Sequence, residues 1–181
     1  MPAIRDFSQA YTTSTSGTTI VVPMPAYAQD DLLVAVLSAD TGTGTWSATG
    51  WTEYFRQTNT SQLCVMYKIA SASESDTTFT STSAETYNGA IISIRDVNTT
   101  TPFHGTAGTK NSSLAKDTAP TLTTSIDNCL ILYLVAKSAV GVPSFIEGPV
   151  TLLFGKDGSA HSDGCGWGFM ATAGTTLPTL V

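Results

Sequence analysis

The chain has 181 residues, a formal net charge of -6 and a charged fraction of 12%, about half of the ~25% that is usual in soluble domains. Thr and Ser contribute 31 and 19 residues, so hydroxyl groups take the place of many surface charges. Only 8 residues are Lys or Arg, which excludes a general basic surface for nucleic acid and argues against an electrostatic membrane anchor. We find neither an apolar run of the ~20 residues that a transmembrane helix needs nor a secretory signal peptide.

Short strand-like runs follow one another along the whole chain, separated by Gly, Ser, Thr, Asn, Asp and Pro. The first series is Thr18–Val22, Leu32–Ala39, Thr52–Gln57, Leu63–Ala70, Thr77–Thr82 and Gly89–Val97. The second series is Thr121–Thr124, Cys129–Ala136, Val150–Phe154, Gly164–Ala171 and Thr175–Val181. The spacers are too short for helical crossovers, so the sequence predicts an all-β, antiparallel β-sandwich in one domain spanning residues 1–181. Residues 1–11 are predicted to form an N-terminal arm.

The two series resemble each other, which suggests two pseudo-repeated halves, 18–97 and 119–181. Asp30–Ala39 resembles Asp127–Ala136, the run from Gly50 resembles the run from Gly148, and Cys64–Ala70 resembles Cys165–Ala171. Strand sequences also resemble one another without duplication, and the sequence leaves both readings open. If the repeat is real, the second half has no counterpart of the run ending at Val97. Either the terminal run packs at the domain edge, or a neighbouring subunit covers the sheet edge that is left.

The three cysteines, Cys64, Cys129 and Cys165, each lie within an apolar strand-like run. This position predicts buried free thiols in a reducing compartment rather than metal ligands, which need close Cys and His spacing. Whether Cys64 and Cys165 face each other across the sandwich is left open.

Residues that could support catalysis are few. His161, Ser162 and Asp163 are adjacent, whereas catalytic triads are assembled from separate parts of a chain. Calcium at Asp157, Ser159 and Asp163 is an alternative to a solvated polar turn, and the turn is the reading we favour. We therefore expect no enzyme, no cofactor and no metal. An enzyme would need a critical residue among His104, His161, Asp157 and Asp163.

A set of short motifs in the first half carries a family resemblance. The motifs are Asp30-Asp-Leu-Leu, Gly50-Trp51, Tyr67-Lys68 and Arg95-Asp96-Val97, set among the predicted strands. Their order resembles a β-sandwich module of tailed-phage virion proteins, in which the pattern is approximately gly-asp-leu-leu, gly-trp, tyr-lys-ala and arg-gly-val. The resemblance is good from Ile20 to Val97 and loose in the second half. Asp30 and Asp96 depart from the pattern because each stands where the pattern has Gly.

The resemblance implies a jelly-roll-like sandwich that is a non-enzymatic part of a phage virion, made in the host cytoplasm. Within that class we expect a capsid decoration or cement protein that is a homo-oligomer bound to the major capsid protein or to other virion proteins. A tail or neck component is the alternative. The acidic charge suits the outside of a particle, away from packaged DNA. The candidate interface residues lie in the two terminal runs, at Pro2, Ile4, Phe7, Tyr11, Leu177, Leu180 and Val181.

Aromatic residues offer a third reading, a carbohydrate-binding or host-adhesion module. Flat rings stack on sugars, but they also fill cores because they carry a large apolar area. Trp51, Phe55, Trp167 and Phe169 are predicted to be core residues. Trp46, flanked by Gly-Thr and Ser-Ala, is predicted to be the exposed aromatic residue available to a glycan.

Overall fold

The structure is a computed structural model, and it describes residues 1–12, 17–39, 44–58, 61–105, 122–137, 145–147, 151–157, 162–176 and 179–180. Every regular element in these ranges is a β-strand, and every strand pairing is antiparallel. These observations confirm the predicted all-β, antiparallel sandwich. Over the same ranges the protein has no helix that could cross a membrane.

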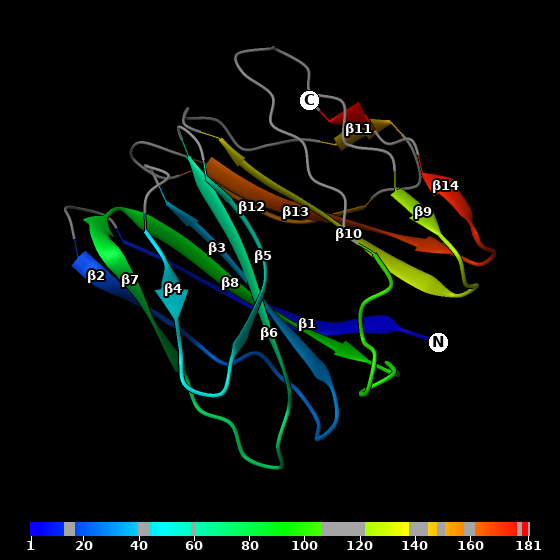
Figure 1. Ribbon diagram of the computed structural model, residues 1–181, viewed down its shortest axis with the longest axis horizontal. Coiled ribbons are helices and arrows are strands. Elements are labelled where there is room, and N and C mark those ends of the chain that lie inside the picture. Colours follow the sequence, from blue (N-terminus) through cyan, green and yellow to red (C-terminus); the bar gives the residue numbers. More distant parts are fainter. Residues whose placement is uncertain are drawn as a thin grey trace.

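The first half of the chain forms two facing sheets (Figure 1). The central sheet has the order β1-β8-β3-β6-β5, built from Ala3–Tyr11, Tyr87–Arg95, Leu32–Ala39, Gln62–Ile69 and Thr52–Thr58. The threonine sheet has the order β2-β7-β4, built from Gly17–Val22, Thr77–Glu85 and Trp46–Ser47. Along the chain, β1 and β3 therefore lie in the central sheet, and β2 and β4 lie in the threonine sheet. The alternation returns at β7, in the threonine sheet, and β8, in the central sheet.

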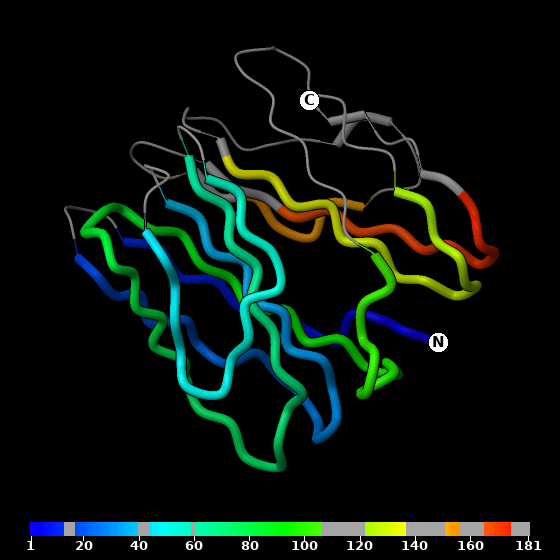
Figure 2. Tube along the Cα trace, viewed as in Figure 1, coloured from blue at the N-terminus to red at the C-terminus, as the bar shows by residue number. Residues whose placement is uncertain are grey.

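The second half adds a third layer on the other side of the central sheet. This C-terminal sheet has the order β10-β13-β12, built from Cys129–Lys137, Ser162–Met170 and Thr151–Asp157. Two short pairs accompany it: β9 (Leu122–Thr124) with β14 (Gly174–Thr176), and β11 (Phe145–Glu147) with β15 (Thr179–Leu180). Figure 2 shows the yellow-to-red strands of this layer beside the blue-to-green strands of the first half.

The middle strands of the central sheet, β3 and β8, are buried on both faces, and two apolar cores result. All eight residues of β3 are buried, and so are all residues of β8 except Arg95. The first core lies against the threonine sheet and includes Ile20, Leu33, Leu37, Cys64, Phe79 and Ile91. The second core lies against the C-terminal sheet and includes Leu32, Val34, Val36, Ile92, Phe154 and Cys165. Continuous apolar runs, rather than alternating ones, are what a strand buried on both faces requires.

The two halves contain three-strand units with the same order and register. In the central sheet Leu37 pairs with Cys64, and in the C-terminal sheet Leu134 pairs with Cys165. These pairings follow the alignment of the two series in the sequence. In each unit a residue with positive φ precedes the first strand and its backbone N–H donates to an alanine carbonyl: Asp30 to Ala70 at 3.0 Å, and Asn128 to Ala171 at 3.2 Å. The matching registers do not decide between a duplication and two independent units, so both readings of the sequence stay open.

The N-terminal residues form a strand, which corrects the prediction of an arm. β1 pairs with β8 from Ala3↔Arg95 to Tyr11↔Asn88, and a bulge at Arg5 interrupts the register. The bulge also breaks the alternation of apolar residues, so the sequence of this segment does not show the period of a regular strand.

Candidate functional site

The N-terminal half of the predicted interface is partly buried within the chain itself. Ile4 and Phe7 pack against the second core, and the Phe7 ring stacks on Phe154 with centroids 5.6 Å apart. Pro2 is half-buried, whereas Tyr11 is 49% exposed. Ile4 and Phe7 therefore hold β1 to the C-terminal sheet, and Tyr11 is the residue of this set with most area to offer a partner.

The C-terminal half of the predicted interface falls outside what the structure describes. Leu177 and Val181 lie outside the described residues, and for Leu180 only the backbone, within β15, is described. Their role as interface residues stays a prediction.

Trp46 is buried, so the prediction of an exposed, glycan-binding Trp46 is wrong. Its exposed fraction is 5%, and its indole Nε1–H donates to Oε1 of buried Gln62 at 2.8 Å. Its ring meets the edge of Tyr87 at a centroid distance of 4.6 Å. Gln62 and Tyr87 are distant from Trp46 in the sequence, so the small residues that flank Trp46 could not indicate these contacts. Trp51 is also buried, as predicted, and it packs edge-on against Phe79.

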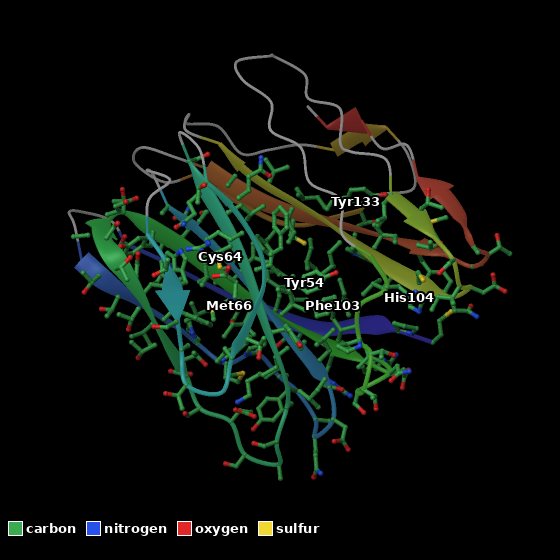
Figure 3. The ribbon with its side chains drawn as sticks, in the orientation of Figure 1. Tyr54, Cys64, Met66, Phe103, His104 and Tyr133 are labelled. Carbon is green, nitrogen blue, oxygen red and sulfur yellow. The ribbon has the colours of Figure 1, made fainter. Side chains whose placement is uncertain are left out.

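A cluster of three half-buried rings offers a different aromatic surface. Tyr54 and Phe103 stack with centroids 3.9 Å apart, and Tyr67 meets the Phe103 ring edge-on at 4.9 Å. Figure 3 shows Tyr54 and Phe103 side by side, and His104, the next residue in the chain, is exposed. A bulge in β5 between Glu53 and Phe55 leaves both Tyr54 and Phe55 packed against the second core. Phe103 comes from a segment outside the strands and almost 50 residues after Tyr54, so strand periodicity could not reveal the cluster.

One buried amide in the central sheet lacks a partner. Asn88 is 2% exposed, and among the described residues its Nδ2 is the buried side-chain nitrogen that has no hydrogen-bond partner. Its register neighbours are Tyr11 on β1 and Ser38 on β3. A buried, unpaired donor costs free energy, because it gives up its hydrogen bonds to water and gains none in return.

The residues considered for catalysis or calcium do not form a site in the part of the chain that is described. His161 and Ser159 lie outside it, and only the backbone is described for Asp157 and Asp163. In register, Asp157 pairs with Ser162 and Asp163 with Lys156. Among the residues that are described, no three His, Cys, Asp or Glu side chains gather as a metal site would need. The reading as an enzyme and the reading as a calcium protein both stay untested.

Asp31 stabilises the entry to β3. It is 3% exposed, its Oδ2 accepts from Arg5 Nε at 2.6 Å and from the Ala28 N–H at 2.8 Å, and Arg5 Nη2 donates to Oδ1 at 3.2 Å. Burial by itself raises the pKa of this carboxyl, but the hydrogen bonds from Arg5 and Ala28 outweigh burial and leave the pKa below its ordinary value. The pair joins β1 to the loop before β3 and has a structural role.

Cys64, Cys129 and Cys165 are buried and none of them is in a disulfide, as predicted. Cys64 belongs to the first core and Cys165 to the second, on opposite faces of the central sheet, so these two thiols do not face each other. Burial, together with the nearby carboxylate of Glu53, raises the pKa of the Cys64 thiol to about 12. A thiol that stays protonated in this way is a poor nucleophile.

Comparisons with protein-family models, with curated proteins and with solved structures found no match for the chain.

Proposed function

We propose that the protein is a non-enzymatic structural component of a tailed-phage virion, a jelly-roll-like module that decorates and stabilises the head. The observation that carries the proposal is a set of backbone conformations in the first half. The phage module has Gly at three positions of its pattern, which correspond here to Asp30, Gly50 and Asp96. All three have positive φ, at 68°, 79° and 58°.

Positive φ is the region that glycine tolerates best, and Asp and Asn are the commonest substitutes. Asp30 and Asp96 depart from the module's sequence but keep the conformation for which the module uses Gly. The backbone conformation at Asp30 and Asp96 therefore agrees with the phage module although the residue types differ. It supports the resemblance at the two positions where the sequence departs from the pattern. The alternation of β1 to β4 between two facing sheets supports the jelly-roll-like plan.

The location of the protein in the particle can be tested directly. Purified virions are separated into heads and tails, and the protein is quantified in each fraction by mass spectrometry. A head decoration protein is expected in the head fraction at a copy number that matches sites on a symmetric shell. Recovery in the tail fraction would replace the head assignment with a tail or neck component, and absence from virions would refute the proposal.

A glycan-binding module is the second candidate function, and the ring cluster of Tyr54, Tyr67 and Phe103 is the observation that favours it. A half-buried Phe103 beside an exposed His104 combines an apolar ring with a polar group, as sugar recognition requires. The test is titration with a broad set of host glycans, followed by tyrosine and tryptophan fluorescence. Binding that is lost in Phe103→Ala supports this function, and the absence of any response rejects it.

A further inference from the structure

The loop of residues 23–31, which connects β2 to β3, is held in place by side-chain carboxylates. Three alternate N–H groups of the loop each donate to a carboxylate: Met24 to Asp76 Oδ1 at 2.9 Å, Ala26 to Asp6 Oδ2 at 2.8 Å, and Ala28 to Asp31 Oδ2 at 2.8 Å. These carboxylates come from β1, from the loop of residues 70–76 and from the end of the 23–31 loop itself. The loop is therefore fixed by acidic groups from three parts of the chain.

Two acidic residues at this end of the sandwich are buried, and each has a basic partner. Asp31 is paired with Arg5 of β1, as described above. The side chain of Glu74 is 7% exposed, and its Oε2 accepts from Lys68 Nζ of β6 at 2.6 Å. Glu74 Oε1 also accepts from the N–H and the hydroxyl of Ser71, at 2.7 and 2.9 Å. The 70–76 loop between β6 and β7 is therefore closed on Lys68, as the 23–31 loop is closed on Arg5.

Backbone and side-chain contacts join the two ion pairs. Ala70 donates its N–H to the Asp31 carbonyl at 2.8 Å and accepts from the Asp30 N–H at 3.0 Å. The Glu74 N–H donates to the Tyr27 hydroxyl, and Tyr27 packs against the first core. Both loops lie at the same end of the sandwich (Figure 2). The 23–31 loop is thus attached to both buried carboxylates, to Asp31 directly and to Glu74 through Tyr27.

The charges around the two carboxylates favour their ionised form. Burial alone raises the pKa of Glu74, but hydrogen bonds from Lys68 and Ser71 outweigh burial and leave the pKa below its ordinary value, as at Asp31. Each carboxylate therefore stabilises the closed loops fully above its unfolded pKa of about 4, and this effect is lost as the pH falls through the lower folded value. The other charged groups here are Arg95, which also lowers the pKa of Asp31, Asp96, which acts on Arg5, and Asp6, Asp30 and Asp76 at the loop.

We propose that the 23–31 loop is an acid-released element, held closed jointly by Asp31 and Glu74 and freed by their protonation while the sheets stay paired. Protonation of Glu74 removes the counter-charge of Lys68, whose side chain is 18% exposed and gains more water only if the loops move. The strands stay paired because the ladders of β3 with β6 and β8 contain none of these carboxylates. Release exposes Met24 and Tyr27, which pack against the first core. The inference goes beyond the proposed function, since it holds wherever the protein is located.

The first test is hydrogen exchange of single backbone amides in the unaltered chain, followed by NMR and corrected for the intrinsic effect of pH on exchange. The Ala28 amide reports on the loop, and the Val36 amide in the middle of β3 reports on the sheets. Between pH 6 and pH 3, we expect the protection of Ala28 to fall at least tenfold more than the protection of Val36. The Met24 and Ala26 amides should follow Ala28.

The second test asks whether the two carboxylates act on one element. Glu74→Gln removes the charge of Glu74 at pH 6, and Glu53→Gln is the matched control, because Glu53 also pairs with a basic residue, Arg56 of its own strand. We expect Glu74→Gln to lower the protection of the Ala28 amide at least threefold, although that N–H is bonded to Asp31, and Glu53→Gln to leave it unchanged. Circular dichroism and the unfolding midpoint show that each variant is folded.

Three results would count against the acid-released element. Equal losses of protection at Ala28 and Val36 show that acid opens the sheets together with the loop, and unchanged protection of Ala28 at pH 3 shows that the loop stays closed. Unchanged protection of Ala28 in Glu74→Gln shows two independent ion pairs and overturns the joint control. None of these results bears on the proposed virion function, which the fractionation of virions tests.

Discussion

Phe7 of β1 stacks on Phe154 of β12, with ring centroids 5.6 Å apart and planes inclined by 27°. The contact links the first strand of the chain to a strand almost 150 residues later, so the C-terminal sheet and the N-terminal strand support each other. It explains why residues 3–11 form an integral strand rather than a free arm.

Replacing Phe7 by Ala should lower the free energy of unfolding by about 2 kcal/mol, less than for a fully buried phenylalanine because the ring is half-buried. Tyr11→Ala, in the same strand but 49% exposed, is the control and should cost less than half as much. Both values come from urea denaturation followed by fluorescence. Equal losses for the two variants would show that the Phe7–Phe154 stack is not a distinct stabilising contact.

The conformation of Asp30 can be tested by substitution. Its φ of 68° should make Asp30→Gly as stable as the wild type or more stable by up to about 1 kcal/mol. Asp30→Val should be destabilised by about 1–2 kcal/mol, because a β-branched residue is strained at positive φ. Thermal or urea unfolding measures both. A valine variant as stable as the glycine variant would contradict the left-handed conformation on which the proposed relationship to the phage module depends.

The Arg5–Asp31 pair should make stability depend on pH. The pKa of Asp31 is lower in the folded than in the unfolded chain, so its stabilising effect is complete above the unfolded value of about 4 and is lost as pH falls through the folded value. The stability difference between wild type and Asp31→Asn should therefore be constant from pH 7 to 5 and shrink below pH 4. Urea denaturation at each pH measures it. A difference that stays constant down to pH 3 would exclude this role for Asp31.

The unpaired amide of Asn88 leads to a prediction about the free energy of unfolding. Asn88→Leu removes the unsatisfied donor and should leave the free energy of unfolding unchanged or raise it by about 1 kcal/mol. Asn88→Asp places a carboxylate at the same buried position and should be destabilising by at least about 2 kcal/mol at pH 7. A loss of stability in the leucine variant as large as in the aspartate variant would show that the amide makes an essential hydrogen bond.

The thiols should be inert while the protein is folded. With the Cys64 pKa raised to about 12 and the thiols buried, a thiol reagent at pH 8 should label none of Cys64, Cys129 and Cys165 within minutes. In 6 M guanidinium chloride all three should react. Rapid labelling of any one in the native protein would identify a reactive site that the fold does not explain.

The sequence predicted the parts of the fold that depend on local pattern. Apolar runs at Leu32–Ala39 and Cys129–Ala136 marked strands. The structure gives the two runs matching registers, Leu37 with Cys64 and Leu134 with Cys165, which the sequence did not predict. The runs did not show that the middle strands of the central sheet are buried on both faces by two different sheets. That arrangement depends on how the second half packs, and no single strand contains the information.

The candidate surfaces were harder to predict because distant residues determine them. Trp46 is buried by Gln62 and Tyr87, which come 16 and 41 residues later, and no neighbour of Trp46 in the chain signals either one. Tyr54 stacks on Phe103, which comes almost 50 residues later and outside the strands, so strand periodicity does not show the contact. The sequence shows the exposed hydroxyl groups of the threonine sheet only as a high content of Thr. The register of its strands is what places these groups on one side.

The most direct test of the central claim is light scattering combined with co-sedimentation of the wild-type protein and tail-less heads that lack it. The proposal of a head decoration protein predicts saturable binding, with a plateau at a fixed number of copies per head. A protein that stays in the supernatant at every concentration, while binding tails or nothing at all, would contradict it.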